Sequence, residues 1–190
     1  MLITSEQLHE MIPHSTDKLI LRYLTPLNKA MEKFQIDTPL RIAAFIAQVA
    51  HESCSLIYSE EIASGSAYEK RGDLGNLLPE ALEVAHANHS TTGRFYKGRG
   101  LLQITGYSNY LSCSKGIDID CVTNPRILSE PEYAAKSAAW FWNIHNLNIL
   151  ADVEMFDKIT HVINGGYNGK AERDTNYRCC KEVLGCNAKK

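Results

Sequence analysis

The sequence predicts a mainly α-helical fold with little or no sheet, built as a single domain over residues 1–190. The length of 190 residues suits one domain, with room for two lobes and a core that needs no metal or cross-link. Apolar residues make up 44% and charged residues 22%, as in an ordinary folded protein. Helix start and stop signals recur along the chain, whereas the alternation typical of strands is rare.

Three capping signals mark expected helix starts. Thr4 followed by Gln7 resembles a capping box, which predicts a short first helix. Thr25-Pro26 and Thr38-Pro39 each place a capping hydroxyl directly before a proline, the favoured order at a helix start. We therefore expect a helix to begin at each of these places.

The clearest helix runs from about Pro39 to Glu52. Apolar residues cover most of its circumference, so we expect it to be buried. Gly185 is a fitting stop for the last helix of the chain. Further helices are expected over 79–88, 107–113, 131–146, 154–163 and 170–184. Irregular glycine-rich segments are expected over 64–76, 93–100 and 164–169, with a short strand pair near 101–105.

Charge and cysteine content argue against several classes of function. The formal net charge is −2, with 20 basic and 22 acidic residues, which leaves no basic stripe for nucleic acid. No stretch approaches the ~20 apolar residues that a membrane span needs. None of the six cysteines forms a CxxC pair, so we expect no structural zinc site. Free thiols are the expected state, and the open alternatives are a Cys113–Cys121 bridge and a pair that includes Cys180 or Cys186.

Glu52 is the first candidate for chemistry. A carboxyl group at the end of an apolar helix is costly unless it is paired or protonated, and a general acid must hold a proton near neutral pH. On position alone, an exposed helix-end glutamate is the simpler interpretation. His51-Glu52 also begins a zinc-protease motif, but Ser55 stands where the second histidine is required. His51 is then either a buried structural histidine or a partner of Glu52.

Glycoside hydrolysis usually requires a second carboxylate. Glu60 and Glu61 follow Glu52 by eight and nine residues, and a chain that folds back would bring one of them across a cleft. Neighbouring side chains in extended chain point apart, so at most one faces the cleft, and two solvated charges are the alternative. A cysteine–histidine hydrolase centred on Cys54 lacks a catalytic pairing motif.

The segment from Gly98 to Gly106 is the third cluster. It lacks the Gly-Lys-Ser/Thr ending of a phosphate-binding loop. In extended chain Gln103 and Thr105 would share one face, over an apolar floor of Leu102 and Ile104. An amide beside a hydroxyl suits the hydroxyl and acetamido groups of a sugar, although any half-buried strand has the same alternation.

In their order along the chain these pieces resemble glycoside hydrolase family 19, and within it the lysozyme-type endolysins of bacteriophages and prophages. The likeness covers about residues 38–186, with residues 1–37 expected as N-terminal helices packed on that region. It rests on Glu60-Glu61 and on five short motifs: FIAQVAHES (45–53), SAY (66–68), DLGN (73–76), GRGLLQITG (98–106) and INGG (163–166).

The resemblance implies a two-lobed, lysozyme-like helical fold with a substrate cleft, and hydrolysis with inversion at the anomeric carbon. It implies that Glu52 is the general acid, that Glu61 is the general base, and that Thr105 helps to hold the attacking water. The residues implied to line the substrate site are Gln103, Asn109, Tyr68, Asn164 and Arg173.

The chain departs from the family pattern in two places. Cys54-Ser55 stands where relatives often carry two glycines, so the turn after Glu52 is expected to differ. Glu60 directly beside Glu61 leaves the identity of the base open.

The expected function is peptidoglycan hydrolysis at β-1,4 bonds between amino sugars, which lyses bacteria. We expect a monomer that uses no cofactor or metal, binds peptidoglycan glycan strands, and neither binds nucleic acid nor inserts stably into a membrane. Residues 1–4 show no secretion signal, so we expect synthesis in the host cytoplasm and passage to the periplasm and cell wall through a holin pore. A chitinase on the same scaffold, a toxin delivered to competing bacteria and a non-catalytic wall-binding module are the alternatives.

Overall fold

The computed structural model describes residues 1–186, which form ten α-helices and three short 3₁₀ helices. The α-helices are α1 Ser5–Met11, α2 Asp17–Lys33, α3 Pro39–Glu52, α4 Pro79–Ala87, α5 Thr92–Phe95, α6 Tyr107–Ile117, α7 Pro131–Ile144, α8 Leu147–Asp152, α9 Phe156–Asn164 and α10 Lys170–Val183. The 3₁₀ helices are η1 Ser66–Tyr68, η2 Gly72–Leu74 and η3 Pro125–Ser129.

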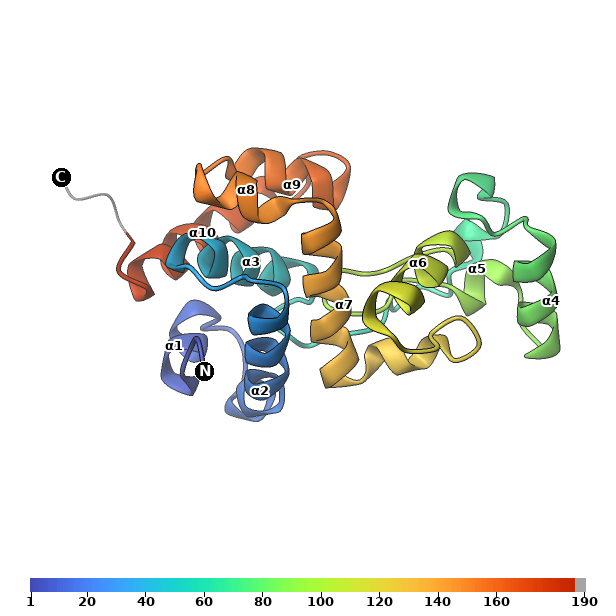
Figure 1. Ribbon diagram of the computed structural model, residues 1–190, viewed down its shortest axis with the longest axis horizontal. Helices are drawn as coiled ribbons and strands as arrows, with labels where there is room; N and C mark the ends of the chain where they lie inside the picture. The colour runs from blue at the N-terminus through green and yellow to red at the C-terminus, as the bar shows by residue number, and fades with distance from the viewer. Residues whose placement is uncertain (187–190) are drawn as a thin grey trace.

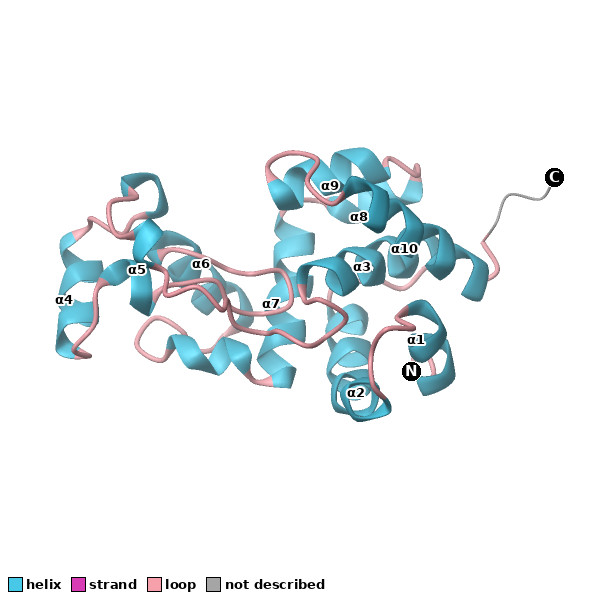
Figure 2. Cartoon of the chain, turned by 180° about the vertical axis from the view of Figure 1, so that it is seen from behind, coloured by secondary structure: helices cyan, strands magenta, loops and turns pink. Residues whose placement is uncertain are grey.

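The helices form two groups joined through α7. One group contains α1, α2, α3, α8, α9 and α10, and the other contains α4, α5 and α6 (Figure 1). Within the first group α3 packs along α10, and α1 also lies against α10. α2 of this group packs along the connecting helix α7. Irregular segments run between the two groups alongside α7 (Figure 2). This arrangement confirms the predicted mainly helical, two-lobed fold, in which the described residues form almost no strand.

α3 is the buried centre of the larger group, as its sequence predicts. Every residue from Ile42 to Ala50 is buried. Thr38 caps the helix by accepting a hydrogen bond from the backbone N–H of Arg41 at 3.4 Å, and Pro39 occupies the first turn, where no partner for its nitrogen is needed. The helix ends at Glu52, so its packing fixes where this carboxyl group stands.

Of the two other capping signals, one is confirmed and one is wrong. Thr4 and Gln7 form the predicted capping box at the start of α1. Thr25-Pro26 starts no helix, because Pro26 lies inside α2, which begins at Asp17 after the cap Thr16. The apolar face of α2 is continuous across the proline, and its burial outweighs the one hydrogen bond that a proline cannot donate.

The segment near 101–105 also differs from the prediction. Instead of a strand pair, Arg99 forms isolated bridges with Glu60 and with Ile104, around a tight turn. Gly100 and Gln103 have φ angles of 84° and 53°, which end extended pairing. The alternation of apolar and polar residues that suggested a strand therefore arises from a turn.

The core between the helix groups is apolar and closely packed. Trp142 is fully buried, and Trp140 is nearly so, with its indole against Gly116 of α6, where a methyl group would lie 1.9 Å from Nε1. Glycine is therefore required where α6 meets α7. The six cysteines, all within the described range, are unbridged, and three of them are buried: Cys113, Cys121 and Cys180.

Candidate active site

Glu52 stands at the end of α3, where a buried cation holds it. Nη2 of Arg173, on α10, donates a hydrogen bond to Oε1 of Glu52 and forms an ion pair with it. The side chain of Arg173 is 1% exposed and that of Glu52 is 19% exposed. The guanidinium is therefore inside the protein, while the carboxyl group reaches the surface.

Arg173 is itself fixed by polar groups of the core. Gln48, one turn before Glu52 on α3, accepts a hydrogen bond from Nη1 of Arg173 and donates one to the hydroxyl of Thr160 at 2.8 Å. Nε of Arg173 donates to the carbonyl of Asn168 at 3.1 Å. The structure thus places Arg173 behind Glu52, with all three guanidinium nitrogens on protein acceptors.

His51 contacts α10 and the residue before it. Its Nδ1 lies 3.0 Å from a carboxylate oxygen of Glu172, a contact that becomes an ion pair when the imidazole is protonated. Its ring lies against Gly169, where a methyl group would lie 2.2 Å from Cε1. Of the two roles open to His51, these contacts favour the structural one.

The chain turns sharply after Glu52 through three residues in the left-handed region: Cys54 (φ 47°), Ser55 (φ 60°) and Leu56 (φ 69°). A residue with a side chain pays about 1–2 kcal/mol for this conformation, which glycine adopts without cost. Ser53 holds the turn, because its hydroxyl donates to the carbonyl of Val49 at 2.7 Å and accepts from the N–H of Leu56 at 2.8 Å. The predicted departure at Cys54-Ser55 is therefore a strained form of a tight turn.

Glu60 is engaged by two cations. Nζ of Lys97 and Nη2 of Arg99 lie 3.0 and 3.2 Å from its Oε1, and the hydroxyl of Ser129 donates to Oε2 at 3.4 Å. Burial raises the pKa of Glu60, but the hydrogen bond of Lys97 and the charge of Arg99 outweigh it and hold this pKa below its ordinary value. The two ion pairs and the lowered pKa make Glu60 a poor proton acceptor.

Glu61 has a different environment, although it is the next residue. Its Oε1 accepts a hydrogen bond from the hydroxyl of Tyr68 at 3.2 Å, and its Oε2 accepts from the backbone N–H of Gly98 at 3.1 Å. Burial and the charge of Glu61 raise the pKa of Tyr68, so this phenol keeps its proton and remains a donor. The two donors orient the carboxylate of Glu61, and no cation of residues 1–186 forms an ion pair with it.

Gln103 and Thr105 meet Glu61 at the bare face of Gly98. A methyl group on the α-carbon of Gly98 would lie 2.6 Å from Oε1 of Gln103 and 3.2 Å from Oγ1 of Thr105. The same methyl group would lie 3.4 Å from Oε2 of Glu61. The absence of a side chain at Gly98 therefore lets a carboxylate, an amide and a hydroxyl converge.

A groove of about 360 Å³ continues from this cluster along α6, α7 and α9. Gln103, Thr105 and Asn109 line it, and the amide of Asn109 donates to the carbonyl of Thr105 at 2.8 Å. Residues of α7, its end and α9 line it as well: Trp140, Phe141, Ile144, His145, Val162 and Ile163. Two of the predicted sugar-site residues, Gln103 and Asn109, thus line the groove together with Thr105, the residue predicted to hold the attacking water.

Asn164 lies at the end of α9, directly after Ile163 of the groove wall. Its Oδ1 accepts a hydrogen bond from the backbone N–H of Asn168 at 3.2 Å, and Gly165 follows in the left-handed conformation. The side chain of Asn164 thus closes the turn that leads to α10.

The sequence interpretation missed three residues that build the site. Gln48 and Gly98 set the positions of the two glutamates, and Lys97 donates to the backbone carbonyl of Glu61 at 2.8 Å as well as pairing with Glu60. Gln48 carried a readable signal, because it is a polar residue in an apolar helix and shares a face with Glu52 four residues later.

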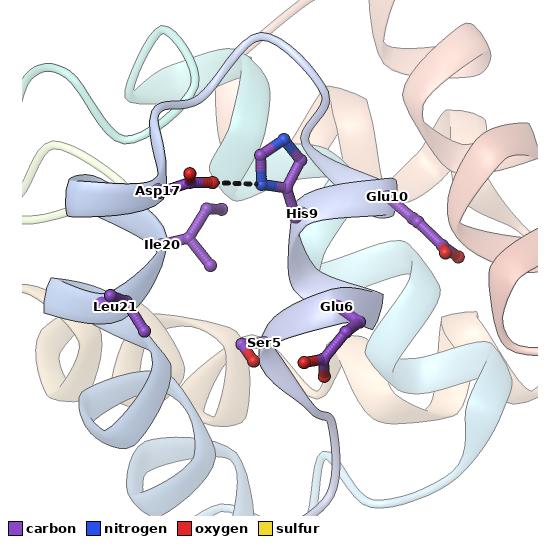
Figure 3. A pocket seen from close by; sticks show the side chains of 7 residues that line it. All are labelled: Ser5, Glu6, His9, Glu10, Asp17, Ile20 and Leu21. Atoms are coloured by element: carbon purple, nitrogen blue, oxygen red, sulfur yellow. Dashed lines mark ion pairs between the residues drawn. The ribbon is translucent and has the colours of Figure 1, made fainter.

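A larger hollow of about 480 Å³ lies elsewhere, between α1 and α2. His9 and Asp17 face each other across it at 2.9 Å, with exposed carboxylates nearby (Figure 3). None of the predicted site residues lines this hollow. We therefore place the candidate active site at the smaller groove.

Residues 1–186 lack two features, a membrane-spanning helix and a metal-binding cluster. No helix there is both long and apolar enough to cross a membrane. The same residues hold no group of three or more histidine, cysteine, aspartate or glutamate side chains arranged to ligate a metal ion.

Known proteins of similar sequence and fold are glycoside hydrolases. An endochitinase of Arabidopsis thaliana is 36% identical over 126 residues, which cover 66% of this chain and 39% of that protein. A glycosyl hydrolase family 19 domain-containing protein of Haemophilus influenzae is 26% identical over 198 residues, covering 94% of this chain and 95% of that protein. The chain thus spans well under half of the plant enzyme but nearly all of the bacterial protein.

Solved structures show the same fold. A bacterial family 19 chitinase superposes with a TM-score of 0.77 at 21% identity, over 98% of this chain and 97% of that one. Chitinase C from Streptomyces griseus gives a TM-score of 0.75 at 21% identity, over 97% of this chain and 77% of that one. The family model for class I chitinases matches residues 35–151, which include Glu52, Glu61 and the segment 98–106. Because this match covers more than half of the sequence, the chain belongs to glycoside hydrolase family 19.

Proposed function

We propose that the chain hydrolyses β-1,4 bonds between N-acetylated amino sugars with inversion, and that its substrate is peptidoglycan. One observation carries the proposal. Glu61, Gln103 and Thr105 converge on the bare face of Gly98, on a segment that follows the turn after Glu52. An acid, a base and groups that hold water and sugar are the parts that an inverting glycosidase needs.

Glu52 is the general acid in this proposal. In its protonated form it gives its proton to the glycosidic oxygen as the bond to the anomeric carbon breaks. Arg173 then stabilises the carboxylate that remains, because its guanidinium already contacts Oε1. The Gln48–Arg173 contacts keep this charge partner in place during the step, so Arg173 acts as a positioning residue.

Glu61 is the general base. It accepts a proton from the water that attacks the anomeric carbon, and its orientation comes from Tyr68 and the N–H of Gly98. The hydroxyl of Thr105 donates to the carbonyl of Gln103 at 3.0 Å, which leaves its oxygen free to accept a hydrogen bond from the same water. Inversion requires the two carboxyl groups to stand about 6.5–9.5 Å apart, with the water between them.

Peptidoglycan is proposed as the substrate because of the SAY and DLGN motifs, which resemble those of the endolysin branch. In the structure these motifs hold Tyr68, whose hydroxyl donates a hydrogen bond to Glu61. Asn76, the last residue of DLGN, donates to the carbonyl of Tyr68 at 2.9 Å and accepts from the N–H of Tyr107 at 2.9 Å. Asn76 thereby links the segment that carries Tyr68 to α6.

Chitin is the second candidate, because the curated plant relatives and the similar solved structures bear the name chitinase. Both polymers have β-1,4 links and N-acetyl groups, so the catalytic residues serve either. Within the peptidoglycan proposal we also propose a monomeric endolysin that reaches the wall from the host cytoplasm through a holin pore. A toxin delivered to competing bacteria is the alternative role for the same reaction.

Product analysis tests reaction and substrate together. The wild-type protein is incubated with purified peptidoglycan and with chitin oligomers, products are identified by mass spectrometry, and the anomeric configuration of the first product is followed by NMR. The proposal expects muropeptide products with inverted configuration. Products only from chitin would replace peptidoglycan by chitin, and retained configuration would overturn the mechanism.

Glutamine variants test the three glutamates. Glu52→Gln and Glu61→Gln should each lower kcat by about 10²–10⁴-fold with the fold retained, because each removes a proton-transfer group. Glu60→Gln should keep most of the activity, and Glu83→Gln, on the exposed face of α4, is the matched control. Substantial activity in Glu52→Gln would refute the acid, and an inactive Glu60→Gln beside an active Glu61→Gln would reassign the base.

A further inference from the structure

Among the described residues, one ionisable side chain lines the groove beside the proposed catalytic cluster. Of the residues that line it, only His145 titrates in the ordinary pH range, and neither aspartate nor glutamate is among them. His145 follows the last residue of α7, and its backbone N–H donates to the carbonyl of Phe141 at 3.3 Å. The end of a packed helix therefore sets the position of this imidazole.

The imidazole of His145 is held against an aromatic ring. Its centroid lies 4.3 Å from that of Phe141, with an angle of 46° between the planes. Burial lowers the pKa of His145, which favours the uncharged ring, and this form can donate one hydrogen bond and accept another. No side-chain hydrogen bond or ion pair within residues 1–186 uses its nitrogens, so they remain available to a ligand.

Two apolar residues beside His145 are exposed to solvent. The side chains of Ile144 and Val162 are 47% and 40% exposed, and both line the groove. Exposed branched side chains beside a hydrogen-bonding group fit a substituent that carries both a methyl group and a carbonyl group. The amides of Gln103 and Asn109, which also line the groove, have the chemistry for the N-acetyl and hydroxyl groups of the sugar itself.

We infer that this groove receives the muramic acid unit of a peptidoglycan strand, with His145 donating a hydrogen bond to the carbonyl of its lactyl ether and Ile144 and Val162 contacting the lactyl methyl group. The inference rests on the proposed function and deepens it. It names the wall that distinguishes a lactyl-bearing sugar from the unsubstituted sugar of chitin. It also identifies His145 as a residue that sets specificity without taking part in proton transfer.

The charge of the groove agrees with such a substrate. After removal of the stem peptide the lactyl group ends in a carboxylate, and with the peptide attached it ends in an amide carbonyl. Either end accepts a hydrogen bond from a neutral imidazole. None of the described residues that line the groove is acidic, so the lining itself carries no negative charge opposite the carboxylate.

The test compares two soluble substrates and two variants of His145. The substrates are peptidoglycan strands freed of stem peptides by an amidase, and chitohexaose. His145→Leu removes the donor at similar size, His145→Gln keeps an amide donor, and His86→Leu, on the exposed surface of α4, is the control. Steady-state kinetics give KM and kcat separately.

We expect His145→Leu to raise KM for the muramic acid strands by about tenfold, the effect of one lost hydrogen bond near 1.4 kcal/mol, with kcat changed by less than about twofold. His145→Gln should recover most of this loss. For chitohexaose, kcat/KM should stay within about twofold of wild type. If the wild-type protein does not cleave chitohexaose, its inhibition constant as a competitor is compared instead.

The outcomes distinguish a failure of this inference from a failure of the proposed function on which it rests. If wild type cleaves the muramic acid strands and His145→Leu leaves KM unchanged, or alters both substrates equally, the inference is overturned and the proposed function stands. If wild type cleaves chitohexaose alone, or neither substrate, the proposed substrate and the inference both fail, and the wild-type protein alone shows it.

Discussion

The two proposed catalytic glutamates are held in opposite ways. Glu52 stands on a buried helix, and a guanidinium from a second helix holds it through contacts inside the core. Glu61 lies in irregular chain, where a phenol and one backbone N–H orient it. We call the surroundings of Glu52 the helix side of the site and those of Glu61 the loop side. Packing and a buried charge fix the helix side. Hydrogen bonds, and the absence of a side chain at Gly98, fix the loop side.

This difference fits the two tasks proposed for the glutamates. The acid ends its step as a carboxylate, so a cation behind it lowers the energy of the product of proton transfer. The base must accept a proton, and a cation in direct contact would oppose that. Glu60 shows the contrast directly beside Glu61, because the side chains of Lys97 and Arg99 pair with the carboxylate of Glu60.

Removing the buried cation should have the largest effect on stability. In Arg173→Met the carboxyl group of Glu52 and the amide of Gln48 lose their partner, and breaking a buried pair costs about 3–5 kcal/mol. The exposure of Glu52 to solvent places the expected loss at the lower end, about 3 kcal/mol in the free energy of unfolding. Urea denaturation measures it.

Arg178→Met, on the exposed face of the same helix, is the control for Arg173→Met. Arg173→Lys should fall between Met and wild type, because it keeps the charge but loses the planar fork. If Arg173→Met unfolds at the same urea concentration as Arg178→Met, the helix side is not held by this charge.

A methyl group at Gly98 should disturb the positions of Gln103, Thr105 and Glu61 while leaving the stability of the fold almost unchanged. In Gly98→Ala the new carbon meets the amide of Gln103 and crowds Thr105 and Glu61, but the end of the Gln103 side chain can move. We expect a loss of about 10- to 100-fold in kcat/KM, with the free energy of unfolding changed by less than about 1 kcal/mol.

Gly72→Ala is the matched control for Gly98→Ala, because its methyl group would meet only Leu77, at 3.5 Å. Both variants are assayed by peptidoglycan hydrolysis and by urea denaturation. Full activity in Gly98→Ala would mean that the convergence on Gly98 is not part of the reaction.

The same contrast explains what could be predicted from the sequence. The helix of Glu52 was predicted with its bounds, because cap, proline and apolar residues all indicate one helix over residues 39–52. Arg173 is separated from Glu52 by 121 residues, so only the resemblance placed it near the acid. The α3–α10 packing that joins them is a tertiary property without a local signal.

On the loop side the chemistry was predicted and the geometry was not. Gln103 and Thr105 were placed together by assuming a strand, whereas the left-handed conformation of Gln103 turns the chain. The choice between Glu60 and Glu61 stayed open because it depends on where Lys97 and Arg99 lie. Both cations are more than thirty residues away in the sequence, so the residues around the two glutamates do not show which one is paired.

The Glu60 cluster should make stability depend on pH. The pKa of Glu60 is lower in the folded protein than in the unfolded chain, so its ion pairs stabilise the fold above the unfolded value of roughly 4.3 and are lost as pH falls through the lower folded value. We therefore expect Glu60→Gln to be less stable than wild type at pH 6, and the difference to shrink towards pH 3.

Urea midpoints of wild type and Glu60→Gln at several pH values measure this difference. Partial exposure of Glu60 keeps the effect below about 1 kcal/mol. The exposed Glu83→Gln serves again as the control, and its difference from wild type should not vary with pH. A difference for Glu60→Gln that is constant from pH 6 to pH 3 would show that the ion pairs contribute nothing.

The turn between the two sides offers the smallest expected effect, and a gain in stability. Cys54 is exposed and has a φ of 47°, so its side chain contributes strain and little packing. Cys54→Gly should relieve about 1 kcal/mol of strain and lose part of it to the greater freedom of glycine in the unfolded chain. We expect a net gain of about 0.5 kcal/mol in the free energy of unfolding.

Cys54→Ala separates strain from the loss of the thiol, because alanine keeps the β-carbon that makes the left-handed conformation costly. It should show no gain, while both variants keep wild-type activity, since the hydrogen bonds of Ser53 still hold the turn. If Cys54→Gly were no more stable than Cys54→Ala, the left-handed conformation at position 54 would carry no measurable strain. The hydrogen bonds of the Ser53 hydroxyl and the burial of Leu56 would then be enough to hold the turn.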